Sequence, residues 1–81
     1  MKILLVEDSR PIRLENERAL IQAGYEVICA EDGQRALQLA GERLPDLILL
    51  DLLLPKISGV EVLEYLKSNP GTAQILSLIH I

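Results

Sequence analysis

Apolar runs alternate along the chain with segments in which apolar residues recur at helical spacing. Residues 2–6, 26–30 and 46–50 are short apolar runs, and their length and flanking residues favour buried parallel strands over helices. Residues 11–23 and 34–43 lie between these runs and carry a helical pattern. The pattern therefore predicts the order strand, helix, strand, helix, strand.

The two predicted helices each have an apolar stripe and local start or stop signals. The stripes consist of Ile12, Ala19, Leu20 and Ala23 in the first helix and Ala36, Leu37, Ala40 and Leu44 in the second. Pro11 fits the first turn of the first helix, and Gly24 fits its C-terminal end. Pro45 ends the second helix and begins the third strand. Glu15 and Asn16 interrupt the first stripe, so its register is the less well specified.

A third helix is predicted over residues 59–68, because Ser58 and Glu61 have the spacing of a capping box ahead of further apolar residues. The turn residues 69–71 break this helix, and the apolar segment 75–81 predicts a fourth strand. Such alternation implies right-handed crossovers and a parallel sheet with helices on both faces, which is an α/β fold. Ligand sites in these sheets lie beyond the carboxyl ends of the strands.

Acidic residues follow two of the predicted strands. Asp51 stands inside the apolar run 47–55, and Glu7 and Asp8 follow the apolar run 3–6. An ionised carboxylate in apolar surroundings needs a partner or a metal. Asp8 taken alone could cap the following helix, whereas capping does not explain a lone Asp inside an apolar run. If the first and third strands are neighbours, the three carboxylates converge on one crevice.

Three converging carboxylates need a positive partner, because their mutual repulsion is on the order of several kcal/mol at intermediate dielectric. Oxygen ligands with no His or Cys nearby select a hard cation. Mg²⁺ is the best candidate, since it binds one or two carboxylates and leaves room for a phosphate. Asp51 could then act as a plain ligand or as a nucleophile toward phosphorus.

Composition and charge restrict the class of protein. The 81 residues form one domain at most, and a content of 49% apolar and 25% charged residues is typical of a globular chain. A net charge of −4 with only eight Lys and Arg residues argues against direct binding to nucleic acid. Cys29 is interpreted as a small buried hydrophobe in a reducing compartment. With no signal peptide or membrane-spanning run, we expect a soluble cytoplasmic protein that binds no membrane.

Several motifs in order resemble the receiver domain of two-component response regulators. The resemblance covers residues 1 to about 75 and is carried by LLVEDS (4–9), GYEV (24–27), AEDG (30–33), AL (36–37), PDLILLDLLLP (45–55) and SGVEVL (58–63). It implies a three-layer, flavodoxin-like doubly wound α/β fold with a parallel sheet in the strand order 2-1-3-4. The fifth strand and the last two helices of the family are missing, so residues 1–81 are expected to be a partial receiver domain.

The resemblance implies a phosphoacceptor signalling module that promotes its own phosphorylation and dephosphorylation, and not an enzyme. Asp51 is then the phosphoacceptor, which attacks the phosphohistidine of a sensor histidine kinase or phosphotransfer protein. Asp8 and Asp51 would ligate Mg²⁺ directly, and Glu7 would act largely through water. The backbone carbonyl of Leu53 would complete the protein's ligands.

The sequence departs from the family near its C-terminal end. The family's fourth strand ends in a Thr or Ser that hydrogen-bonds the phosphoryl group, and this position falls near Ile81; the Lys of the fifth strand is also absent. Since residues 76–81 read unlike the family, we hypothesise a truncated reading frame with a foreign or frameshifted tail there. An output domain would be lost with the C-terminus. The uncovered sheet face and edge predict marginal stability or self-association.

Two other interpretations stay open. A phosphatase with an aspartyl nucleophile normally has a second acid two residues further on, where this chain has Leu53. A non-phosphorylated receiver-like adaptor, or an inactive fragment that acts only by protein–protein interaction, is consistent with the missing hydroxyl and Lys.

Overall fold

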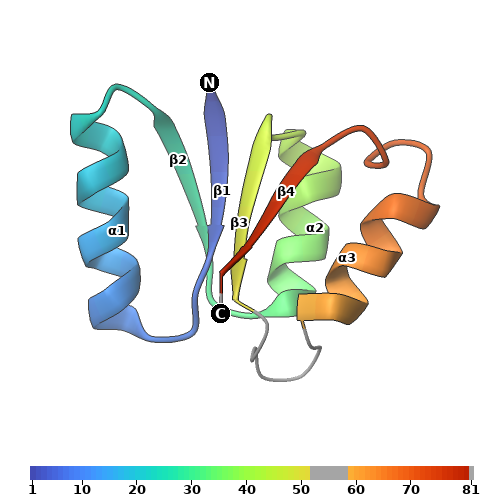
Figure 1. The fold of residues 1–81 in the computed structure, drawn as a ribbon, viewed down its shortest axis with the longest axis horizontal. Helices are drawn as coiled ribbons and strands as arrows, with labels where there is room; N and C mark the ends of the chain where they lie inside the picture. Colours follow the sequence, from blue (N-terminus) through green and yellow to red (C-terminus); the bar gives the residue numbers. More distant parts are fainter. Residues whose placement is uncertain (52–58, 81) are drawn as a thin grey trace.

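Parallel strands form one sheet with helices packed on both faces in the computed structural model of the chain, which describes residues 1–51 and 59–80 (Figure 1). In chain order the elements are β1 (Lys2–Val6), α1 (Arg10–Gln22), β2 (Glu26–Ala30), α2 (Gly33–Arg43), β3 (Leu47–Asp51), α3 (Gly59–Ser68) and β4 (Leu76–His80). Each strand and helix predicted from the pattern is present, with small shifts at the ends.

The sheet has the strand order β2-β1-β3-β4, and each neighbouring pair is parallel. Strand β1 lies inside the sheet, so that Val6 has Ala30 of β2 on one side and Leu50 of β3 on the other. The chain adds β2 to one side of β1 and then β3 to the other, which makes the boundary between β1 and β3 the point where the strand order reverses. The predicted strand order and the doubly wound α/β class are confirmed.

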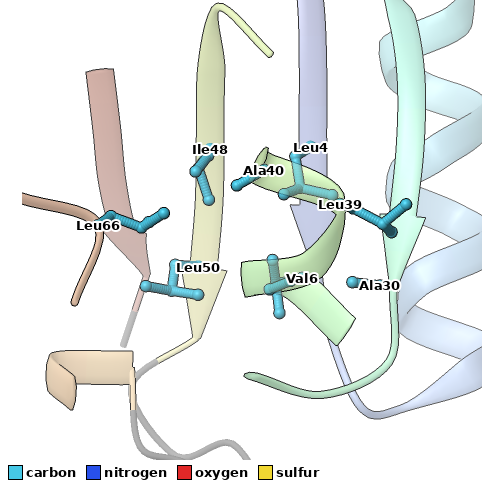
Figure 2. Packing of buried hydrophobic residues seen from close by; sticks show 9 residues of the cluster. Leu4, Val6, Ala30, Leu39, Ala40, Ile48, Leu50 and Leu66 are labelled. Atoms are coloured by element: carbon cyan, nitrogen blue, oxygen red, sulfur yellow. The ribbon is translucent and has the colours of Figure 1, made fainter. Parts of the chain in front are cut away.

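The main core lies between the sheet and helices α2 and α3 (Figure 2). It consists of alternate residues of the strands and of apolar residues from both helices, namely Leu4, Val6, Ala30, Ala36, Leu39, Ala40, Ile48, Leu50 and Leu66. Residues on one face of a strand are two positions apart, so the intervening residues face the opposite layer. This packing fixes the position of the carboxyl ends of β1 and β3.

Helix α1 covers the opposite face of the sheet only in part. It lies against β2 and β1, where Ile3 and Leu5 are buried. Leu47 and Leu49 of β3 are only half-buried, and no residue of α1 itself is buried. This layer is therefore thinner than the layer formed by α2 and α3.

The apolar stripes predicted for the first two helices need correction. In α1 the half-buried positions are Arg13, Glu17 and Leu20, which share one helix face, so charged side chains occupy much of the packed side. In α2, Leu39 is buried, whereas Leu44 is 58% exposed. Leu44 is the C-cap of α2 with a left-handed backbone (φ 45°), and this conformation takes its side chain off the helix face.

Turn residues mark both ends of α1 as predicted. Pro11 lies in the first turn, directly after the N-terminal end of the helix. Gly24 follows the helix with φ 97°, and its backbone N–H donates to the carbonyl of Ile21 at 3.0 Å. Of the predicted capping box of α3, Glu61 lies in the first turn, while Ser58 lies outside the described residues.

Candidate functional site

Two acidic segments leave the sheet next to each other at its carboxyl edge. Strands β1 and β3 are adjacent and in register, with Val6 opposite Leu50. Glu7 directly follows Val6, and Asp51, the last residue of β3, directly follows Leu50. Because parallel strands end at the same edge of a sheet, the backbone brings the segment that contains Glu7 and Asp8 beside Asp51.

Hydrogen bonds hold the turn of residues 7–9, which joins β1 to α1. The backbone N–H of Glu7 donates to the carbonyl of Ala30 at 3.1 Å and so extends the contact with β2. The backbone N–H of Ser9 donates to the carboxylate of Glu7 at 3.4 Å. Glu7 is half-buried, whereas Asp8 is exposed. Asp8 therefore offers an accessible carboxylate from a backbone that is held on both sides.

Asp8 is not the cap of the helix that follows it. The N-cap of α1 is Ser9, and the side chain of Ser9 makes no capping hydrogen bond. The local alternative considered for Asp8, a helix-capping carboxylate, is therefore wrong. Its place one residue before the cap leaves the carboxylate available for a ligand.

A cation beside the acidic turn was not among the predicted site residues. The guanidinium of Arg13 donates through Nη1 to the backbone carbonyl of Glu7 at 2.9 Å, in a half-buried position. Arg13 belongs to the packed face of α1, together with Glu17 and Leu20. A basic residue one helical turn after Ser9 is the sequence feature that could have indicated this contact.

Two groups of the predicted site lie outside the described part of the chain. They are the side chain of Asp51 and the backbone carbonyl of Leu53. Among the side chains that the structure does describe, which include Glu7 and Asp8, no three His, Cys, Asp or Glu residues form a group able to hold a metal ion. The backbone of Asp51 lies opposite His80 of β4, which places the end of β4 at the same edge.

Asp32, another acid that follows a strand, has a local structural role. Its side chain is 7% exposed. It is the N-cap of α2, and its carboxylate accepts the backbone N–H of Arg35 at 2.9 Å. The helix predicted from Gln34 lacks this cap, although an Asp ahead of an apolar helical pattern is a usual start signal.

The helices within residues 1–51 and 59–80 are all too short or too polar to cross a membrane.

Comparisons with known proteins identify the family of the chain. The family described as the response regulator receiver domain matches residues 3–79. The alkaline phosphatase synthesis transcriptional regulatory protein PhoP of Bacillus subtilis is 43% identical over 77 residues, which are 95% of this chain and 32% of PhoP. The uncharacterized transcriptional regulatory protein YrkP of the same organism is 46% identical over 68 residues, or 84% of this chain and 29% of YrkP. The chain thus spans about a third of the length of these curated relatives.

Solved structures give the same assignment. The N-terminal domain of a response regulator receiver protein from Methanoculleus marisnigri superposes with a TM-score of 0.93 at 36% identity, over 96% of this chain and 63% of that one. The chemotaxis response regulator CheY4 of Vibrio cholerae superposes with a TM-score of 0.92 at 33% identity, over 96% of this chain and 65% of CheY4. With the family match, the shared fold and the acids at the switch point of the sheet, the chain belongs to the receiver domain family of two-component response regulators.

Proposed function

We propose that the chain is a phosphoacceptor module that takes a phosphoryl group onto Asp51 from a sensor histidine kinase or a phosphotransfer protein. The register of β1 and β3 supports this most directly, because it brings Asp51 to the same edge as the turn that carries Glu7 and Asp8. An accessible Asp8 that does not cap a helix adds to this support.

The proposed site would take Mg²⁺ through Asp8, Asp51 and the backbone carbonyl of Leu53, with Glu7 acting largely through water. The donors are all oxygen atoms, which suit a hard cation that keeps part of its water shell. Mg²⁺ supplies positive charge that offsets the repulsion between the carboxylates and the oxygens of the phosphoryl group. The affinity of the proposed site for Mg²⁺ depends on how rigidly hydrogen bonds fix the turn of residues 7–9.

The transfer exchanges one bond to phosphorus for another. A carboxylate oxygen of Asp51 attacks the phosphorus of a phosphohistidine, the O–P bond forms, and the P–N bond breaks. The imidazole of the donor leaves with the electron pair and takes a proton from solvent. The product is an acyl phosphate on Asp51. Since the attacking group and the phosphoryl group are both anionic, the reaction depends on the positive charge at the site.

Phosphorylation by a small donor tests the proposal without the cognate kinase. The chain is incubated with acetyl phosphate, with and without Mg²⁺, and intact mass spectrometry detects the added phosphoryl group. We expect a Mg²⁺-dependent adduct in the wild type and none in Asp51→Asn. Asp46→Asn is the matched control, because Asp46 lies just before β3, at the opposite end of the strand from Asp51. The carboxylate of Asp46 accepts the backbone N–H of Lys2 at 2.7 Å, and an Asn side chain keeps an oxygen for this bond.

An adduct that persists in Asp51→Asn would show that another residue is the acceptor and would refute the proposal. A non-phosphorylated adaptor or an inactive fragment would be favoured by two results together. These are no phosphoryl adduct, and no change in the amide chemical shifts of the folded chain on addition of beryllofluoride and Mg²⁺. Rapid steady release of inorganic phosphate would favour an aspartyl phosphatase, although Leu53 stands where such enzymes usually have their second acid.

A further inference from the structure

We infer that Arg13 is a positioning residue of the acidic site, whose side chain holds the turn of residues 7–9 so that Asp8 is presented in one orientation. The contact that carries this inference is the hydrogen bond from Nη1 of Arg13 to the backbone carbonyl of Glu7 at 2.9 Å. The effect on the turn stands by itself. The effect on Mg²⁺ affinity rests on the proposed function.

The Arg13 side chain meets the backbone of Glu7 at the point where strand β2 ends. The N–H of Glu7 still bonds to Ala30, which is the last residue of β2. Beyond Ala30 the chain turns into α2, whose N-cap is Asp32. The guanidinium of Arg13 donates to the half-buried carbonyl of Glu7 at this point, and the loss of a donor to a half-buried carbonyl is costly.

Arg13 contacts the turn at two points that lie on either side of Asp8. Its side chain binds the carbonyl of Glu7, and its backbone N–H donates to the carbonyl of Ser9 at 2.8 Å. The side-chain bond holds the peptide group between Glu7 and Asp8. The backbone bond holds the peptide group between Ser9 and Arg10, and it is the first helical bond of α1, which most residues at position 13 would also make. A ligand that is held before the metal arrives loses less conformational entropy when the metal binds.

The positive charge of Arg13, like its hydrogen bond, stabilises the acidic turn. A guanidinium beside the turn offsets part of the repulsion between neighbouring carboxylates, and it is screened less than an exposed charge because Arg13 is half-buried. Arg18 lies on the same helix but is exposed. It provides a matched control, since its substitution removes the same charge and the same type of side chain from α1.

The experiment compares Arg13→Met with Arg18→Met in the full 81-residue chain. Methionine keeps an unbranched apolar stem, so the packing of α1 changes little. Amide hydrogen exchange is measured without metal, and Mg²⁺ affinity is measured by titration of amide chemical shifts. We expect faster exchange at Glu7 and Ser9 in Arg13→Met, and a Mg²⁺ dissociation constant raised by about 10-fold, as for other residues that orient metal ligands. Arg18→Met should match the wild type in both measurements.

Equal exchange at Glu7 and Ser9 in the two variants would overturn the inference. If the wild type shows no response to Mg²⁺, the proposed function fails, and the exchange measured without metal still decides the role of Arg13. If Arg13→Met does not fold, the side-chain NMR signals of the wild-type chain test the role of Arg13 instead. Slow rotation and slow exchange of the Arg13 guanidinium protons, relative to those of Arg18, support the inference, and averaged Arg13 signals overturn it.

Discussion

At the scale of a single residue, burial and the neighbouring Glu17 make the thiol of Cys29 less acidic. Cys29 is half-buried, and its Sγ donates to a carboxylate oxygen of Glu17 at 3.4 Å, so the prediction that Cys29 is a buried hydrophobe is wrong. Burial raises the pKa of this thiol from its ordinary 9.0 to about 11, with further contributions from the hydrogen bond and the negative charge of Glu17, while Arg13 lowers it. The thiol is therefore a poor nucleophile at neutral pH.

The pKa of Cys29 predicts a loss of stability in alkaline solution. Because the unfolded thiol ionises near pH 9.0 and the folded thiol near 11, the contribution of this group is complete below pH 9.0 and disappears as the pH rises to about 11. We expect Glu17→Gln to lower the pKa of the thiol, since it removes the negative charge. The pH profile of iodoacetamide alkylation measures this shift, with Glu15→Gln, an exposed position on the same helix, as the control. An unchanged alkylation midpoint in Glu17→Gln would contradict the assignment.

Leu44 predicts a stabilising substitution. It holds a left-handed backbone (φ 45°) at the end of α2, and 58% of it is exposed, so its side chain gains little from burial. Leu44→Gly should raise the free energy of unfolding by about 1 kcal/mol, because glycine adopts this conformation without steric cost. Ala23→Gly at the C-cap of α1, where φ is −77°, should instead be slightly destabilising. Urea unfolding of both variants checks the prediction, and a loss of stability in Leu44→Gly would refute it.

At the scale of a single element, the C-terminal end of α3 depends on a buried hydroxyl. The last carbonyls of a helix have no partner within it. Thr72 is 5% exposed, and its hydroxyl donates to the carbonyl of Leu66 at 2.8 Å. We expect Thr72→Val, which keeps the shape of the side chain, to lower the free energy of unfolding by about 1–2 kcal/mol, because it leaves that carbonyl without its donor.

The matched control for Thr72→Val is Ser68→Ala, at the last residue of α3. The hydroxyl of Ser68 also donates to a helix carbonyl, that of Tyr65 at 3.0 Å, but in an exposed position. Water can replace this donor, so the change should stay within about 0.5 kcal/mol. Equal losses in the two variants, measured by urea unfolding, would show that burial does not decide the effect.

At the scale of the whole molecule, the thin layer on the α1 side predicts self-association. Leu47 and Leu49 are half-buried, Ile12 is 49% exposed, and β2 and β4 are the edge strands of the described sheet. Exposed apolar surface and open strand edges favour contact between copies of the chain. Association should increase as the pH approaches the isoelectric point of about 4.8, where the net charge of −4 at pH 7 is lost.

Sedimentation equilibrium over a range of concentrations measures this association. Ile12→Gln should weaken it, whereas Tyr65→Gln should not, because Tyr65 is a 60% exposed residue of α3 on the better covered side. A chain that stays monomeric at 9.0 kDa at all concentrations and melts in one sharp transition would contradict the prediction.

Local pattern predicted the strands well because their apolar runs are bounded by turn residues and charges. β1 and β2 begin and end where expected. β3 begins one residue later than predicted; Asp46, just before it, bonds to Lys2 through both its backbone N–H and its carboxylate. The face of α1 that packs on the sheet could not be predicted. Apolar spacing predicts that Ile12 and Ala19 lie on that face, whereas in the structure the charged residues Arg13 and Glu17 are half-buried and Ile12 and Ala19 are exposed.

The sequence by itself determined the alternation of strands and helices and the acids at the ends of the first and third strands. Both follow from local spacing, which each segment carries without reference to the others. Only the structure decided that β1 and β3 are neighbours, that Ser9 and not Asp8 caps α1, and that Arg13 binds the turn between β1 and α1. Strand pairing depends on packing between segments far apart in the chain, and the cap and the Arg13 contact depend on individual hydrogen bonds. Neither kind of contact leaves a periodic pattern in the sequence.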